Sequence, residues 1–345
     1  MTETPPTAHE RQKKPLAQRP SLKRVYASII VAFGWLLFLA LWLFYYATSF
    51  GIVQNIAVFL LSLVVAGMIL TVLWVPWATD RPIEAHCIGR IMNFIPLELS
   101  VTNCFLIKAG DHYVLIDTGY EDDWDLFRTR LNEAGVELSQ ISHIILTHHH
   151  DDHCGLLRNI LWENHSIRVV MSHLCKDLIL RGENDRTHGG GFLNRRIAFL
   201  MRRRRLYLSL VLKKVIAKGK IDTFPPYRLR NCDILVAEDT GLREIGIPLD
   251  SKIIETPGHT VDSISVLFDD GDCLIGDAAS NFLQFLGAKY CVVLITDMSA
   301  YYQSWEKVIA AGARQIFPAH GAPFTVDKLK TNLWKNKAEN IVPYT

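Results

Sequence analysis

The sequence has no Asp, Glu, Lys, Arg or His between Val25 and Thr79. This uncharged stretch is more than twice as long as the about 20 residues that one membrane span needs. It is also too long for the apolar core of a signal peptide and has no clear small-residue cleavage site, which argues against a cleaved leader. Its only polar, glycine-containing interruption lies at 48–55. We therefore predict two transmembrane helices, roughly 26–47 and 54–75, with a buried hairpin of a soluble core as the alternative.

The sequence also lacks paired cysteines and a strong excess of charge of one sign. The seven cysteines form no CxxC pair, and their odd number and scattered positions argue against a disulfide-dense secreted scaffold. The chain also lacks a strong charge imbalance, because 37 Lys and Arg residues face 35 Asp and Glu residues for a net charge of +2. This balance does not by itself indicate a nucleic-acid-binding protein.

Basic residues gather before the first apolar run, whereas the turn between the two predicted spans carries no charge. The basic residues are Arg11, Lys13, Lys14, Arg19, Lys23 and Arg24. The positive-inside rule then predicts a cytoplasmic tail (1–24), a transmembrane hairpin (25–79) and a cytoplasmic catalytic domain (80–345). A single span would place that domain on the opposite side.

Beyond Pro82 the sequence changes to short apolar runs separated by turn signals. The runs 103–110 and 112–119 flank Gly110-Asp111 and predict a β-hairpin, and 122–135 has the spacing of a helix. Later apolar runs end in Gly, Pro, His or Asp, at 143–147, 167–172, 251–260, 263–277 and 313–321. This order predicts a layered α/β domain with polar residues gathered at the ends of strands.

The densest polar group is LTHHHDDHCGLL, residues 146–157, which we call the histidine loop. It holds four candidate metal ligands at the spacing H-x-H-x-D-H: His148, His150, Asp152 and His153. Imidazole nitrogens and carboxylate oxygens suit divalent metals such as zinc, and the loop offers two half-sites. Three later strand ends each offer one more ligand: His259 in TPGHT, Asp277 in IGDA and His320 in PAHG.

These motifs, preceded by LIDTG, resemble those of the metallo-β-lactamase superfamily over roughly residues 85–325. The resemblance implies a four-layer αββα sandwich, here preceded by two transmembrane helices, with metals in a groove at one edge of the two sheets. It implies a first metal site of His148, His150 and His259 and a second site of Asp152, His153 and His320. Asp277 would bridge both metals, and Asp117 of DTG would support the site from behind.

Two divalent metals would lower the pKa of a bridging water, so that hydroxide attacks an ester-like carbon or phosphorus. Asp152 is the candidate catalytic residue, because it would bind a metal and face that hydroxide. His149 and Asp151 should point away from the metals and make supporting hydrogen bonds or contact solvent. Cys154 is expected to be a small packing residue. Zinc is the first expectation for the metals, with iron or manganese as alternatives.

The predicted function is a membrane-anchored binuclear hydrolase for a carboxylic ester, thioester or lactone. A phosphodiesterase or nuclease of the same superfamily is the alternative enzyme, and a metal-binding membrane sensor or scaffold is the alternative without turnover. Ser280 stands where many acyl-homoserine lactonases have tyrosine, which argues against that activity. The presence of all seven ligands argues against a decayed enzyme.

An insertion at about 176–230 accounts for the long separation of His148 from His259. It contains THGGG (187–191) and then a run at 192–220 in which apolar residues alternate with basic blocks. One interpretation is a basic amphipathic lid on an anionic membrane leaflet, and the other is a solvated surface elaboration. His188 is the one histidine outside the motifs for which we consider a functional role. The expected partners are membrane lipid and a small amphiphilic substrate, without nucleic acid, and the oligomeric state is left open.

Overall fold

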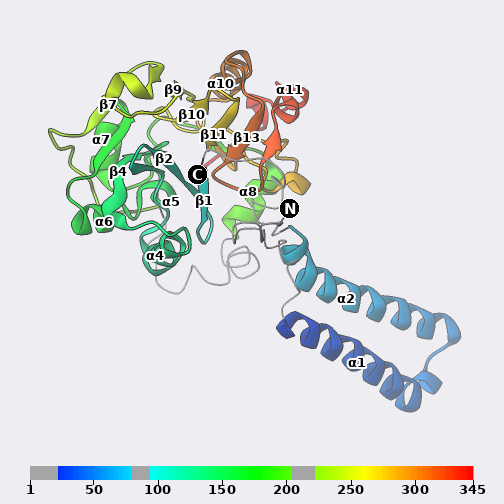
Figure 1. The fold of residues 1–345 in the computed structure, drawn as a ribbon. Helices are drawn as coiled ribbons and strands as arrows, with labels where there is room; N and C mark the ends of the chain where they lie inside the picture. Colours follow the sequence, from blue (N-terminus) through cyan, green and yellow to red (C-terminus); the bar gives the residue numbers. More distant parts are fainter. Residues whose placement is uncertain (1–21, 80–93, 204–221, 345) are drawn as a thin grey trace, which may run out of the picture. The chain divides into compact units, whose positions relative to one another are not determined.

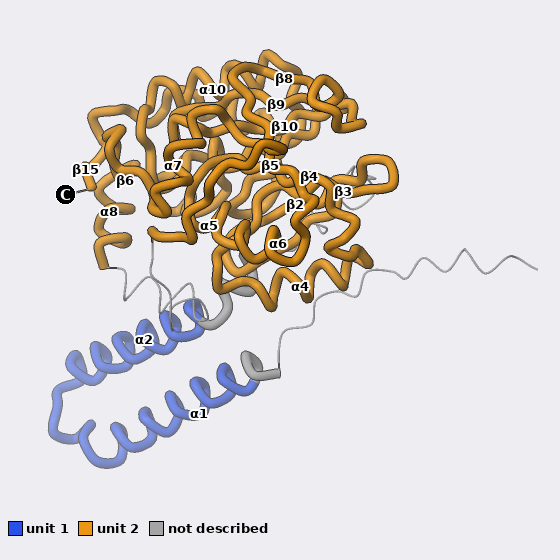
Figure 2. The backbone as a smooth tube through the Cα atoms, turned by 90° about the vertical axis from the view of Figure 1, so that its left-hand side faces the viewer, with its two compact units in different colours: residues 1–81 blue, residues 82–345 orange. Residues whose placement is uncertain are grey.

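The computed structural model describes residues 22–79, 94–203 and 222–344, and the chain divides into two compact units, 1–81 and 82–345 (Figures 1 and 2). The first unit is a helical hairpin of α1 (Leu22–Tyr45) and α2 (Ile52–Thr79), joined by the short helix η1 (Ala47–Ser49). Both helices are long and apolar enough to cross a membrane, over Tyr26–Tyr45 and Ile52–Val72. The prediction of two such helices is confirmed.

The polar interruption at 48–55 extends from the turn into the first turn of α2. Gln54 accepts a hydrogen bond from the Gly51 amide at 2.9 Å. Asn55 donates to the Ala47 carbonyl at 2.8 Å and accepts from the Trp42 indole at 2.9 Å. These polar side chains satisfy backbone groups at the helix end, which is why α2 begins slightly earlier than predicted.

The second unit contains two six-stranded sheets (Figure 1). The first sheet comprises β1 (Phe94–Glu98), β2 (Asn103–Ala109), β3 (His112–Ile116), β4 (Ile141–Ile145), β5 (Arg168–Ser172) and β7 (Ile234–Val236), in that order. The second sheet comprises, in spatial order, β14 (Phe324–Thr325), β13 (Gln315–Pro318), β11 (Asp272–Gly276), β10 (Ile264–Phe268), β9 (Ser251–Glu255) and β8 (Thr240–Gly241). The predicted hairpin about Gly110-Asp111 is β2–β3.

Helices cover the outer faces of the two sheets. They include α4 (Trp124–Glu133), α5 (Asp151–Cys154), α6 (Leu157–Glu163), α7 (Cys175–Arg181), α8 (Arg195–Arg202), α10 (Met298–Ala310) and α11 (Asp327–Asn332). The helix predicted at 122–135 forms as α4, after a short helical turn η2 (Glu121–Asp123), and ends before Gly135.

Three apolar clusters define the layers. Alternate residues of β2 point to opposite faces, so Phe105 packs between the sheets while Leu106 packs under α4 and α6. In β11, Leu274 packs between the sheets while Ile275 packs against α10 and α11. The order helix, sheet, sheet, helix confirms the αββα sandwich that the resemblance implied.

A small third sheet joins three distant segments in the order β12 (Leu294–Ile295), β6 (Gly191–Phe192) and β15 (Val342–Pro343). Gly191 is needed here because a Cβ atom at this position would lie 2.1 Å from the Val342 carbonyl oxygen. The THGGG motif therefore serves a close backbone approach. The larger part of the predicted basic run, residues 204–221, lies outside the described residues.

Candidate metal centre

The proposed ligands all follow the ends of strands. The histidine loop follows β4, and His259, Asp277 and His320 follow β9, β11 and β13. Because β11 and β13 are parallel neighbours, the segments after them meet at one edge of their sheet. The parallel pair β3 and β4 similarly places Asp117 beside the start of the histidine loop. The topology thus brings residues that are far apart in sequence to one place.

Three histidines form the first ligand group. His259 Nε2 lies 3.2 Å from His148 Nε2 and 3.0 Å from His150 Nδ1. Burial, and then the neighbouring imidazoles, hold the pKa of both His148 and His150 well below the usual range, so both rings are neutral. Neutral nitrogens with converging lone pairs are the form of histidine that binds a metal.

Asp152, His153 and His320 form the second ligand group. His320 Nε2 lies 3.1 Å from Asp152 Oδ2, and His153 Nε2 lies 3.7 Å from Asp152 Oδ1. Burial alone would raise the pKa of Asp152, but the adjacent His153 and His320 lower it below the usual range. The Asp152 carboxylate is therefore ionised and also accepts a hydrogen bond from the Thr102 hydroxyl at 3.4 Å.

Asp277 lies between the two groups and faces each with a different oxygen. Its Oδ2 is 3.4 Å from His259 Nε2 of the first group. Its Oδ1 is 3.4 Å from His320 Nε2 and 3.7 Å from His153 Nε2 of the second group. A carboxylate shared in this way is suited to contact two cations at once.

The donor set fits divalent cations by a further observation. Among the described residues, His153 Nε2 and Asp277 Oδ1 are buried and have no hydrogen-bond partner. Buried polar atoms normally find a partner, and both of these atoms face the space shared by the ligand groups. Nitrogen and carboxylate donors suit zinc, iron and manganese alike, so the donor set leaves the identity of the metal open.

The outer nitrogens of the ligand histidines are fixed by hydrogen bonds. His153 Nδ1 lies 2.8 Å from Asp117 Oδ2, which also accepts from the Thr147 hydroxyl at 2.8 Å. His259 Nδ1 donates to the Leu294 carbonyl at 2.8 Å, and His320 Nδ1 donates to the Val101 carbonyl at 3.1 Å. Such bonds set the ring orientation and tautomer of a metal ligand. Asp117 thus contacts His153 on the side of the ring that faces away from the candidate ligand group.

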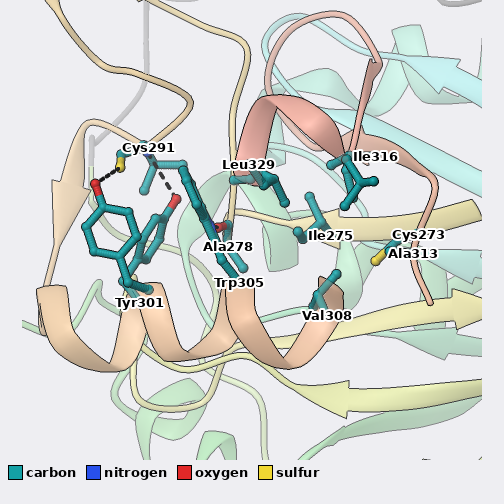
Figure 3. Packing of buried hydrophobic residues seen from close by; sticks show 14 of the residues in the cluster. Cys273, Ile275, Ala278, Cys291, Tyr301, Trp305, Val308, Ala313, Ile316 and Leu329 are labelled. Carbon is teal, nitrogen blue, oxygen red and sulfur yellow. Dashed lines mark hydrogen bonds between the residues drawn. The ribbon is translucent and has the colours of Figure 1, made fainter. Parts of the chain in front are cut away.

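Two aromatic residues of helix α10 hold the backbone at Asp277 and Ala278, and Figure 3 shows Trp305 beside Ala278. The Tyr301 hydroxyl donates to the Asp277 carbonyl at 3.2 Å, and the Trp305 indole donates to the Ala278 carbonyl. Gly258, just before His259, has φ +130°, and a Cβ atom there would lie 2.3 Å from the Tyr301 amide nitrogen. One helix therefore supports two of the ligand segments. No sequence motif marks Tyr301 or Trp305, because their helical spacing indicates only a packed face.

The two remaining polar residues of the histidine loop point away from the ligand groups. His149 Nδ1 bonds Asp262 Oδ1 at 2.9 Å, and His149 Nε2 accepts from the Asp185 amide at 3.0 Å. The Asp151 carboxylate accepts from Asn184 Nδ2 at 2.8 Å and from the Asp222 amide at 2.9 Å. Both residues make supporting hydrogen bonds, and both are buried, so solvent contact is not their role.

Two other residues considered from the sequence lie near this region. The Cys154 thiol is buried and donates to the His149 carbonyl at 3.2 Å, and burial raises its pKa well above the usual range. It therefore stays protonated and packs, instead of acting as a thiolate. His188 is about half exposed and forms an ion pair with Asp185. Asp185 also forms an ion pair with Arg181 at 2.9 Å. His188 is absent from the ligand groups.

Comparisons with known proteins identify the family of this chain. Residues 97–320 match the family model described as the metallo-beta-lactamase superfamily. Thioesterase pkgB of Emericella nidulans is 34% identical over 111 residues, which cover 30% of this chain and 32% of that protein. The beta-lactamase-like protein 2 homolog of Caenorhabditis elegans is 24% identical over 264 residues, which cover 72% of this chain and 66% of that protein. The probable metallo-hydrolase YqjP of Bacillus subtilis is 26% identical, and the match covers 64% of this chain and 67% of that protein.

The chain thus spans from about a third to two thirds of the length of these curated relatives. The family model, by contrast, covers most of the second unit, from within β1 to the last proposed ligand, His320. With the fold and the ligand geometry described above, this match establishes that the chain belongs to the metallo-β-lactamase superfamily of metallo-hydrolases.

Proposed function

We propose that this chain is a membrane-anchored hydrolase that holds two divalent metal ions and cleaves an ester-like bond in a carboxylic ester, thioester or lactone. One observation carries the proposal: Asp277 presents one oxygen to each of two ligand groups, at 3.4 Å from His259 and 3.4 Å from His320. Two ions bound there would supply Lewis acidity and lower the pKa of water toward neutrality.

The chain's own residues divide the remaining work. Asp152 is ionised, and its Oδ2 lies within reach of the Thr102 hydroxyl and of His320 Nε2. An ionised carboxylate in this position can orient a water molecule and accept its proton. Asp117 and the carbonyls of Leu294 and Val101 hold the ligand rings, so the site needs little reorganisation when substrate binds.

The ester-like bond is favoured by the relatives. Thioesterase pkgB of Emericella nidulans matches the chain at 34% identity, and the atrochrysone carboxyl ACP thioesterase of Aspergillus fumigatus is 35% identical over 77 residues. These matches cover 30% and 22% of the chain, so they support the class of bond and leave the acyl group open.

The membrane anchor is supported by the N-terminal hairpin. Large apolar side chains such as Ile30, Phe33 and Phe44 are 71%, 69% and 80% exposed within it, and such a surface requires an apolar environment. The basic residues before the first apolar run favour an N-terminus on the cytoplasmic side, and with two spans they favour a hydrolase domain on that side too.

The test uses the full chain in a neutral detergent. Metal content is measured by elemental analysis, and turnover is measured on a panel of carboxylic esters, thioesters, lactones and phosphodiesters. We expect two divalent ions per chain, and turnover of a carboxyl-derived substrate that falls roughly a hundred- to thousandfold in Asp277→Ala. The matched control is Asp327→Ala on α11, whose side chain is 74% exposed and should not affect turnover.

Two results would contradict the proposal. Turnover of phosphodiesters alone would reassign the enzyme to the alternative hydrolase class. Full metal loading without turnover of any member of the panel would favour a metal-binding sensor or scaffold.

A further inference from the structure

The outward face of α8 is basic. Arg195, Arg196, Arg202 and Arg203 are all exposed, whereas Ile197 and Ala198 are buried against the core of the second sheet. Three of these arginines, with Ala198, Phe199 and Val342, line a shallow surface cavity of about 430 Å³. We call this cavity the arginine groove and define it by Arg195, Ala198, Phe199, Arg202, Arg203 and Val342.

The groove is held in shape by its surroundings. The Asn194 side chain caps α8 by accepting from the Arg196 and Ile197 amides, both at 3.0 Å. Its Nδ2 donates to the Leu286 carbonyl at 3.2 Å, which fixes the start of the helix. Across the groove, Val342 belongs to β15, which pairs with Phe192 of β6 just before α8. Ligand binding there would not have to order the helix first.

In the arginine groove, the positive charges of Arg195 and Arg203 are not neutralised by a carboxylate within the described part of the chain. Arg195, Arg196 and Arg203 have no carboxylate within salt-bridge distance there, although other exposed arginines, such as Arg128 and Arg243, do. Arg203 lies over the Phe199 ring, with its guanidinium carbon 4.2 Å from the ring centre. Phe199 itself is 58% exposed. The groove therefore combines several guanidinium donors with one exposed aromatic ring.

We propose that the arginine groove binds the phosphate-bearing headgroups of anionic phospholipids, so that α8 docks the hydrolase unit on the surface of the membrane that anchors it. Guanidinium groups match phosphate oxygens in geometry and charge. An exposed aromatic ring beside them suits the headgroup region of a bilayer. The proposal rests on the membrane anchor of the proposed function, because tethering by α1 and α2 raises the effective concentration of headgroups near the unit.

The apolar face of α8 is buried in the protein and is therefore not available for contact with lipid. A lid that lays its apolar face in the membrane requires Ile197 to be available, but Ile197 is fully buried in the protein. Contact with lipid must therefore use the arginine side of α8, through charge. A nucleic acid is a weaker candidate, because the chain has a net charge of only +2 and the groove occupies one face of an eight-residue helix.

The test compares the full chain in two kinds of lipid nanodisc, one of phosphatidylcholine alone and one with about a third phosphatidylserine. Hydrogen–deuterium exchange of the peptide covering 195–202 reports contact with α8. We expect this exchange to be roughly fivefold or more slower in the discs that contain phosphatidylserine, since each basic residue near an anionic surface contributes on the order of a fivefold gain in binding.

Two triple variants separate charge from fold. Arg195→Gln/Arg196→Gln/Arg203→Gln should abolish the difference between the two discs, whereas the corresponding Lys variant should keep most of it. Arg128→Gln/Arg243→Gln, which removes two exposed arginines outside α8, is the matched control and should keep the full difference. Exchange in phosphatidylcholine discs should be the same for all variants if α8 stays folded, and the single variant Arg203→Gln serves if the triple variant does not.

Several results would overturn the proposal. Equal exchange in the two discs would show that α8 makes no lipid contact. Equal slowing by inorganic phosphate, or by an acidic polypeptide or RNA, in phosphatidylcholine discs would assign the groove to that ligand instead. Incorporation into discs and turnover are measured separately. A chain that fails to hydrolyse the substrate panel therefore contradicts the proposed function and not the groove's preference for lipid, whereas a chain that does not enter discs contradicts both proposals.

Discussion

The histidine loop and helix α8 differ in where their charged side chains lie, because those of the loop are largely buried and those of α8 are exposed. In the histidine loop, the ionisable side chains are almost fully buried, and each has a partner inside the protein or faces the shared space of the ligand groups. At α8 the arginines are exposed, and Arg195, Arg196 and the adjoining Arg203 lack a carboxylate partner within the described residues. Buried converging donors suit a cation, whereas exposed guanidinium groups suit an anionic surface.

Hydrogen bonds connect these two regions. His149 and Asp151, the residues of the histidine loop that are not proposed ligands, bind Asp185, Asn184 and the Asp222 amide. Residues 184–185 before α8 and Asp222 after it are therefore hydrogen-bonded to the loop that carries the proposed ligands. The two regions are thus connected by hydrogen bonds although their charged side chains lie in different environments. Substitutions in each region can test this difference separately.

Among substitutions outside the proposed ligands, the largest effect is expected from Asp117→Asn. The carboxylate of Asp117 accepts from the Thr147 amide, the Thr147 hydroxyl and His153 Nδ1, each at 2.8 Å. An amide at this position would face two donors with an NH₂ group, so the His153 ring would lose its orientation. We expect metal affinity to fall about 10- to 100-fold, measured by competition with a chelator.

The control for this substitution is Asp262→Asn. Asp262 is also buried and also holds a histidine of the loop, His149, at 2.9 Å, but His149 is not a proposed ligand. Metal affinity should stay within about threefold of the unmodified chain, which is small on the scale of such supporting effects. Equal losses in the two variants would mean that the loop responds as a whole, and that the separation of ligand from supporting histidines is wrong.

The part of this site that could be predicted from the sequence is the part that lies in short motifs. Spacing within 146–157 pointed to four candidate ligands, and the ends of three later strands offered His259, Asp277 and His320. The supports could not be predicted in the same way. Tyr301 and Trp305 bond backbone carbonyls after β11, and Val101 accepts from His320 across 219 positions. Backbone acceptors carry no residue type, so a sequence pattern cannot mark them.

The fold likewise has parts that the sequence could predict and parts that it could not. Short apolar runs predicted β2, β3 and β4, because these strands pack against the other sheet on one face and against helices on the other. The third sheet was not predicted, since its strands are two residues long and come from three distant places. Asp262 did leave a signal, because a charged residue two positions before a fully buried strand such as β10 requires a partner inside the protein.

A smaller effect is expected from Asn184→Ala, which removes two of the hydrogen bonds between the histidine loop and the residues before α8. Asn184 accepts from the Asp151 amide at 2.9 Å and donates to the Asp151 carboxylate at 2.8 Å. Its loss leaves two buried groups without these partners and should cost about 1–3 kcal/mol locally. Hydrogen exchange of residues 183–192 should accelerate, while metal content stays unchanged.

Asn164→Ala is the matched control for that link. Asn164 donates to the carbonyls of Leu138 and Ile141, away from the proposed ligands and α8. The variant should lose comparable stability without faster exchange at 183–192. If both variants accelerate exchange there, the segment opens with the whole unit and is not held by the histidine loop.

The smallest effect concerns a histidine outside both regions. His143 on β4 is half-buried, and burial, with Arg168, lowers its pKa to about 4. The folded chain thus takes up this proton less readily than the unfolded chain, whose histidines titrate near pH 6.5. Stability is therefore lost as the pH falls from about 6.5 toward 4, and His143→Gln should remove that loss.

After an allowance for screening by solvent, the gain of His143→Gln at pH 5 over pH 7.5 should be on the order of 1 kcal/mol. In thermal unfolding this corresponds to about 2–4 °C for a unit of this size. The measurement uses chain treated with a chelator, so that loss of metal from the histidine loop does not contribute. His165→Gln at an exposed position should give no gain at either pH. If His143→Gln also gives none, the acid sensitivity of the unit originates in the buried side chains of the histidine loop, and the contrast with the exposed arginines of α8 becomes sharper.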